Sequence, residues 1–146
     1  MQLNDLWNYI REHELLSDTE IEYVKTCIED VTEMSPSDKP MIFRKMERLI
    51  EDSDKLSWCI FSVRQQLNKM NKAYKQIKDP DYVTLVRQGR PSSEAINSEV
   101  RWRNDSLYDL EEDIATVENI IEYLVHLDHS LEKYNYMLKD KLSIEK

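Results

Sequence analysis

The chain of 146 residues is long enough for one folded domain, and its 40% hydrophobic and 34% charged residues are typical of helices with narrow buried stripes and broad solvated faces. A single glycine and only four prolines exclude most tight hairpin turns, so the predicted fold class is all-α. The net charge of −9 by itself disfavours a polyanionic partner, and no apolar run approaches the roughly 20 residues needed to span a bilayer.

The first 40 residues form an acidic segment with two predicted helices. Leu3 to Glu12 is typical of a short helix, and the run from Ser17 to Glu20 is a capping box that begins a second one. The apolar residues of the second helix fall on one face, at Ile21, Val24, Ile28 and Val31. Pro36 and Pro40 are expected to separate residues 1–40 from the rest of the chain.

The strongest pattern lies in the centre of the chain, where no glycine or proline interrupts residues 41–79. Apolar residues recur there in alternating steps of three and four, through Met46, Leu49, Ser53, Leu56, Ile60, Val63, Leu67, Met70, Tyr74 and Ile77. This stripe predicts one coiled-coil helix of about 38 residues, with its most buried positions from Leu56 to Leu67. Pro80 is expected to end the helix, because proline lacks the N–H donor and biases Asp79 away from the α region.

A linker is predicted over residues 79–103, and a second long helix follows it. Residues 82–90 fit either a helical turn or a short extended piece, and Ser92 or Ser93 is expected to cap one or two further turns. The last helix should reach about Leu142, with a stripe at Leu107, Leu110, Ile114, Val117, Ile121, Leu124, Leu127, Leu131, Tyr134 and Leu138. The two long stripes predict a helical hairpin over residues 41–146, although they could equally pack between copies of the chain.

Charge is distributed unevenly along the chain. Residues 1–40 carry 3 basic and 10 acidic side chains, residues 41–103 carry 13 and 8, and residues 104–146 carry 4 and 11. The candidate nucleic-acid-binding residues are the cations of the basic centre, namely Lys69, Lys72, Lys75, Lys78, Arg87 and Arg90. The lysines recur in steps of three and drift around one helix flank, and Tyr74, Tyr82 and Trp102 lie among them as possible stacking rings. The alternative is that the lysines only keep a coiled coil soluble and that the rings are packed inside.

Catalytic and metal-binding motifs are lacking in the sequence. There is no glycine-rich phosphate loop and no nucleophile elbow, so we expect no enzyme and no cofactor. Glu122, His126 and His129 have spacing that fits a metal, but they also suit an ordinary amphipathic helix, and no metal site is predicted. Cys27 and Cys59 are not in CxxC spacing, and an apolar signal region is lacking, so a reduced cytoplasm is expected, the host's if the protein is viral.

The order of these parts resembles the UvsY recombination mediators of large tailed phages. The resemblance covers roughly Ile42 to Lys139, where the lysine-rich helix with Tyr74 leads to a segment with Tyr82, Gly89 and Arg90 and then to a long helix. That last helix contains Glu122-Tyr123-Leu124 and ends in Tyr136-Met137-Leu138-Lys139. The resemblance implies an all-α protein that forms a ring through its C-terminal helices, binds single-stranded DNA and helps a recombinase displace a single-strand-binding protein.

Two functions follow as hypotheses from these observations. The first is a non-enzymatic, single-strand-binding recombination mediator that forms a homo-oligomer, with its copies joined through Leu124, Leu127, Leu131 and Leu138. The second is an acidic coiled-coil adaptor or assembly protein that binds other proteins without nucleic acid. Steep salt dependence of DNA binding would favour the first over the second.

Overall fold

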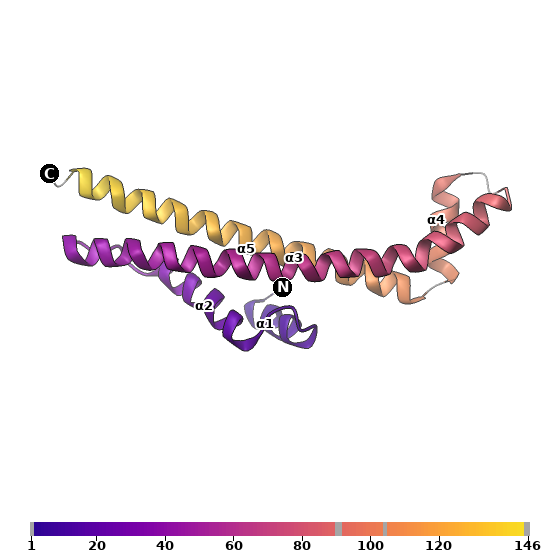
Figure 1. Ribbon diagram of the computed structural model, residues 1–146, viewed down its shortest axis with the longest axis horizontal. Helices are drawn as coiled ribbons and strands as arrows, with labels where there is room; N and C mark the ends of the chain where they lie inside the picture. Colours follow the sequence, from indigo (N-terminus) through magenta and orange to yellow (C-terminus); the bar gives the residue numbers. More distant parts are fainter. Residues whose placement is uncertain (1, 90–91, 104, 145–146) are drawn as a thin grey trace. The chain divides into compact units, whose positions relative to one another are not determined.

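The computed structural model describes residues 2–89, 92–103 and 105–144, and they are almost entirely helical. Its helices are α1 (Leu3–Glu12), α2 (Asp18–Thr32), α3 (Lys39–Arg87), α4 (Ser93–Arg103) and α5 (Asp105–Ile144), and no strand occurs among these residues (Figure 1). The all-α prediction is therefore confirmed. Contacts divide the chain into unit 1 (Met1–Arg64 with Ile120–Lys146) and unit 2 (Gln65–Asn119), so α3 and α5 contribute to both.

Local hydrogen bonds define the turn between α1 and α2. The N–H of Leu15 donates to Ile10 O at 3.0 Å and the N–H of Glu14 to Arg11 O at 3.2 Å, the two bonds of a Schellman motif. Glu14 accordingly has a positive φ of 51°. The predicted capping box begins α2, because Ser17 Oγ accepts from the N–H of Glu20 while the Glu20 carboxylate accepts from the N–H of Ser17.

In unit 1, α3 packs against both α2 and α5, which lie on either side of it (Figure 1). Towards α2, the Cys27 thiol donates to Asp52 O at 3.5 Å; towards α5, Ser53 Oγ donates to Asp128 Oδ1 at 2.7 Å. The α3 residues buried between its neighbours are Ile42, Lys45, Leu49, Asp52, Leu56, Cys59, Ile60 and Val63. They cover a wider arc than the single stripe predicted from the sequence, because two helices rather than one cover α3.

Two details of the predicted stripes are wrong. On α2, Cys27 and Asp30 are buried, whereas Ile28 and Val31 are only half-buried, so the buried face is rotated from the predicted one. On α3, Leu67 is also only half-buried. It belongs to unit 2, in which α2 takes no part.

The leucine stripe of α5 is covered within the chain. Leu124, Leu127, Leu131 and Leu138 are all buried in unit 1. Two hydrogen bonds hold the same end of α5 to the connection after α2, from Tyr134 Oη to Glu33 O at 3.0 Å and from Lys141 Nζ to Pro36 O at 2.8 Å. These leucines were predicted to join copies of the chain, but their burial needs no second copy.

Unit 2 has a small core of its own. The buried residues Leu85, Ile96, Val100 and Leu107 form it, with Tyr74, Ile77 and Tyr82 packed against them. Ser92 provides the expected cap of α4, accepting from the N–H of Ala95 at 3.2 Å. Most of the predicted linker is therefore helical, and α4 is longer than the expected one or two turns.

The helix break predicted at Pro80 does not occur, because α3 continues through it to Arg87 and is 49 residues long. Pro80 cannot donate to the carbonyl of Gln76, but both residues are exposed, and an exposed helix carbonyl without an intrahelical donor can be hydrated. Beyond the proline, Leu85 is completely buried in the core of unit 2. Apolar burial by the last two turns offsets the missing hydrogen bond.

Truncation of a buried side chain should lower the free energy of unfolding much more than truncation of an exposed one. Leu56→Ala should lower the free energy of unfolding by about 2 to 5 kcal/mol, because the Leu56 side chain is 0% exposed and its removal leaves a cavity. Urea unfolding followed by circular dichroism measures the change. Met137→Ala, on an α5 residue that is 47% exposed, is the control and should have a much smaller effect. Equal losses in the two variants would contradict this packing.

Replacement of Pro80 tests the continuity of α3. Pro80→Ala should raise the free energy of unfolding by up to about 3 kcal/mol, since alanine restores the missing donor inside the helix. Pro40→Ala is the control, because Pro40 lies in the first turn, where helical N–H groups have no intrahelical acceptor. If α3 ended at Asp79, Pro80→Ala would give no gain over this control.

Candidate nucleic-acid interface

The predicted lysine row lies on the solvent side of α3 in unit 2. Lys69, Lys72 and Lys75 are exposed, and none of them forms an ion pair with a residue that the structure describes. Successive lysines are about 4.5 Å apart along the helix axis and turn by about 60° around it. The three ammonium groups therefore form a short oblique line of uncompensated positive charge.

The other predicted cations differ from these three. Lys78 is half-buried, and its Nζ lies 5.4 Å from the centroid of the Tyr74 ring, a cation–π distance. Arg87 is exposed at the last residue of α3. Arg90 lies outside the described residues.

The predicted stacking rings are used inside unit 2. Tyr74 packs against the core, and its hydroxyl donates to Glu111 Oε1 of α5 at 2.5 Å. Tyr82 is half-buried against the same core, and its hydroxyl donates to Ser93 Oγ at 3.4 Å. The side chain of Trp102 lies outside the described residues. The lysine row therefore offers positive charge, while Tyr74 and Tyr82 support the helix that carries it.

Charge in unit 2 is segregated by helix. Residues 65–78 of α3 carry four lysines and no acidic residue, whereas residues 105–119 of α5 carry six acidic residues and no basic one. Any attraction for an anion is therefore local to the α3 surface, and it extends over about one Debye length, roughly 10 Å at 0.1 M salt.

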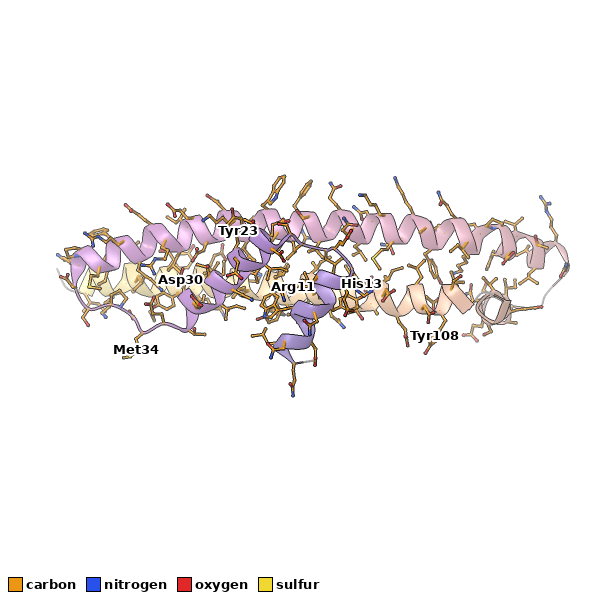
Figure 2. All side chains as sticks on the ribbon, turned by 90° about the horizontal axis from the view of Figure 1, so that it is seen from below. Arg11, His13, Tyr23, Asp30, Met34 and Tyr108 are labelled. Atoms are coloured by element: carbon orange, nitrogen blue, oxygen red, sulfur yellow. The ribbon has the colours of Figure 1, made fainter. Side chains whose placement is uncertain are left out.

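A buried ionic cluster in unit 1 was not predicted. Asp30, Lys45 and Asp52 are each only 4% exposed, and Figure 2 shows Asp30 where α2 lies against α3. Lys45 Nζ lies 3.4 Å from Asp30 Oδ1 and 2.7 Å from Glu33 Oε2, and Arg48 Nη1 lies 3.2 Å from Asp30 Oδ1. Lys45 and Asp52 are one heptad apart among otherwise apolar positions of α3. That spacing is the sequence signal that could have identified them.

The two buried carboxyl groups have opposite pKa shifts. Burial, a hydrogen bond with Asp30 and the negative charge of Asp30 raise the pKa of Asp52 from 3.8 to about 7. Burial alone would raise the pKa of Asp30, but hydrogen bonds from Asp52 and Arg48 and the charge of Lys45 outweigh burial and lower it. Asp30 and Asp52 each also have a buried Oδ2 atom without a hydrogen-bond partner among the described residues.

Both thiols of unit 1 are buried among the same helices. Burial is the main cause that raises the pKa of Cys27 to about 12 and that of Cys59 to about 11. The Cys59 thiol donates to Glu20 O across α2 and α3 at 3.7 Å. At neutral pH both are therefore protonated and poor nucleophiles.

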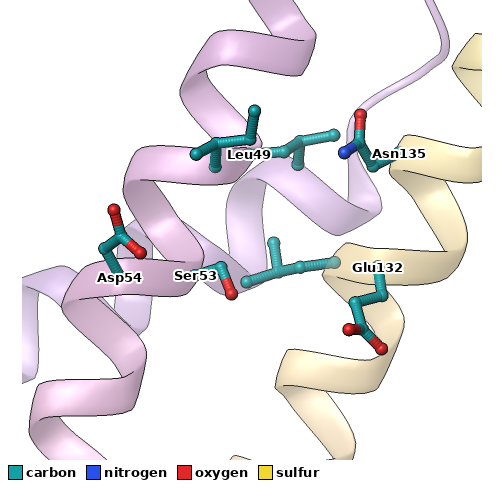
Figure 3. Close-up of a pocket in the computed structure, with 7 residues that line it drawn as sticks. Leu49, Ser53, Asp54, Glu132 and Asn135 are labelled. Carbon is teal, nitrogen blue, oxygen red and sulfur yellow. The ribbon is translucent and has the colours of Figure 1, made fainter.

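A small open recess lies between α3 and α5 in unit 1 (Figure 3). Leu49, Ser53 and Asp54 line it from α3, and Glu132 and Asn135 line it from α5. Asn135 Oδ1 is buried there without a hydrogen-bond partner. Ser53 Oγ, in the same lining, donates to Asp128 Oδ1 at 2.7 Å and so is held in the contact between α3 and α5.

The histidines considered from the sequence lie on the surface of α5. His126 Nε2 lies 4.0 Å from Glu122 Oε1. His129 Nδ1 lies 3.6 Å from Glu132 Oε2, so its acidic neighbour is Glu132 and not Glu122. No group of three or more potential metal ligands occurs among the described residues. None of the helices, over the same residues, combines the length and apolar character needed to cross a membrane.

Comparison with models of protein families, with curated proteins and with solved structures finds no match.

The ionic cluster predicts a specific pH dependence of stability. The pKa of Asp52 is raised on folding, so its stabilising contribution is complete below pH 3.8 and disappears as the pH rises through about 7. Asp52→Asn cannot ionise. We therefore compare the free energy of unfolding of Asp52→Asn with that of the parent at two pH values. As the pH rises from 5.5 to 8.5, this difference should shift in favour of the variant by about 1 to 2 kcal/mol.

Denaturant unfolding at the two pH values measures this change. Asp54→Asn, at an exposed position of the same helix, is the control and should show no comparable change relative to the parent. A pH response of Asp52→Asn that equals the control's would show that Asp52 ionises normally.

Proposed function

We propose that the protein is a non-enzymatic recombination mediator that binds single-stranded DNA and assists the loading of a recombinase. The observation that carries the proposal is the row of exposed lysines Lys69, Lys72 and Lys75, without ion pairs to described residues, on a chain with a net charge of −9. Cations that are free to exchange counterions for phosphates are the main source of affinity in binding of this kind.

Two features support this site in particular. The acidic residues at positions 105–119 belong to α5. One of them, Glu111, accepts a hydrogen bond from the Tyr74 hydroxyl on the core side of α3. The three lysines are on the other side of α3, which faces solvent. Arg87 adds an exposed cation at the end of the same helix. The site would bind the backbone of a single strand without reading its sequence, because phosphate contacts carry no sequence information.

The proposal also includes a coiled-coil hairpin of α3 and α5 and a homo-oligomer. In unit 1, Lys45 of α3 lies beside Tyr134 of α5, and Ser53, further along α3, lies beside Asp128, which comes earlier in α5. The two chain directions are therefore opposite, as expected for an antiparallel pair. The α5 leucines are occupied inside the chain, so contacts between copies would use another surface.

A matched pair of variants tests the DNA site. Lys69→Glu with Lys72→Glu and Lys75→Glu should abolish most binding to a fluorescent oligothymidine. For single strands, the log–log salt slope should also become shallower by about 0.7 for each phosphate that is no longer neutralised, or by roughly 2 when all three lysines are reversed. Fluorescence anisotropy over a series of salt concentrations measures both effects.

The control carries the same change in net charge elsewhere. Lys39→Glu with Lys133→Glu and Lys139→Glu reverses three exposed lysines of unit 1. It should bind nearly as well as the parent if the row itself is the site. Equal weakening in both triple variants would mean that only net charge matters, and absence of binding by the parent would leave the adaptor as the better hypothesis.

A further inference from the structure

An apolar stripe lies on the side of α3 that faces solvent in unit 1, and we infer that it is a two-fold interface with a second, antiparallel copy of the chain. The stripe consists of Phe43, Ile50, Trp58 and Phe61, which are 55%, 54%, 61% and 51% exposed. Figure 2 shows side chains that project into solvent from this helix. The inference does not depend on DNA binding, so failure of the DNA experiment leaves it standing.

The four side chains share one face of the helix. Steps of seven, eight and three residues place them within an arc of about 80° around the α3 axis. The rings of Trp58 and Phe61 are in contact, with centroids 5.6 Å apart. The face is separate from the buried one, which α2 and α5 cover.

The exposed apolar area is large enough to contribute much of an interface. Large side chains of these types present about 150 to 250 Å² each when fully exposed. With about half of that area accessible, the stripe offers roughly 400 Å² per copy, half of the ~800 Å² that each partner of a standard interface buries. Flanking side chains of the same helix can provide the remainder.

The acidic residues within the stripe favour an antiparallel second copy of the chain as its partner. Glu47 and Asp54 interrupt the stripe, so a parallel arrangement would place each opposite its own copy. When two copies cross antiparallel at the level of Asp52, Phe43 comes level with Phe61 of the other copy, Glu47 with Ser57 and Asp54 with Ile50. Neither Glu47 nor Asp54 then comes level with Glu47 or Asp54 of the other copy, and Glu51, beside the stripe, comes level with Ser53.

Basic residues beside the stripe add to this complementarity. Arg44 lies within about 3 Å along the axis of Trp58 in the other copy, which suits a cation–π contact. Lys55, whose Nζ is 4.8 Å from the Tyr23 ring of its own chain, comes level between Glu47 and Glu51 of the other copy. The same two acidic positions, Glu47 and Asp54, make the face unsuitable for a lipid surface.

Light scattering after size exclusion tests the interface. At tens of micromolar the parent should have the mass of an even-numbered assembly. Trp58→Ser with Phe61→Ser should halve that mass and weaken association by roughly thirtyfold or more, as expected for central aromatic anchors. Tyr136→Ser with Met137→Ser, which removes similar exposed side chains from α5 in the same unit, should leave the mass unchanged.

Circular dichroism should show that all these variants keep the helicity of the parent, since every changed residue is exposed. A monomeric parent at 100 µM would overturn the inference. So would an assembly whose mass does not respond to the Trp58 and Phe61 changes.

Disulfide trapping tests whether the α3 helices of the two copies are antiparallel. A mixture of the Phe43→Cys and Phe61→Cys variants should form covalent dimers on mild oxidation. Each variant alone should form few, because two copies of the same position are offset by about 27 Å along the axis in the antiparallel pair. The parent, whose Cys27 and Cys59 are buried, provides the background. Trapping of either variant with itself as readily as in the mixture would exclude the antiparallel arrangement.

Discussion

The packing of α3 against two helices at once is the constraint on which unit 1 depends. Leu49, Leu56 and Val63 lie where the face towards α2 and the face towards α5 meet, and all three are buried. Because α2 and α5 together cover about half of the circumference of α3 in unit 1, the residue types at these covered positions are closely constrained. The remaining arc of α3 faces solvent, and the exposed aromatic residues of α3 in unit 1, namely Phe43, Trp58 and Phe61, lie on it.

Much of this architecture could be predicted from periodicity and local signals. The bounds of α1, the capping box of α2 and the long stripe of α5 each depend on contacts between residues close in sequence, which a pattern reports directly. Pro80 shows the limit of such signals. A proline usually ends a helix, but the outcome depends on whether later residues such as Leu85 find a core, and that core is formed by α4 and α5, far away in sequence.

Of the candidate sites, the lysine row could be predicted from the sequence, but the pairing within the buried ionic cluster could not. The exposure of Lys69, Lys72 and Lys75 follows from their helical spacing opposite the apolar stripe. The heptad spacing of Lys45 and Asp52 among apolar positions indicates a buried face, but it does not identify the partners of the two charges. A buried charge is tolerable only when partners compensate its loss of hydration, and here those partners, Asp30 and Glu33, belong to the preceding helix and its end. The pairing of α2 with α3 had to be known before the charges could be placed.

Burial of the two thiols has a consequence for measurements of motion. A protonated, covered cysteine reacts with an alkylating reagent only after the helices around it have separated. Cys27 and Cys59 face each other's helices from α2 and α3, so both should become reactive in the same opening event. The rate of alkylation in the unmodified protein therefore reports how often α2 leaves α3, and comparison of the two sites shows whether it leaves as a whole or by fraying from one end.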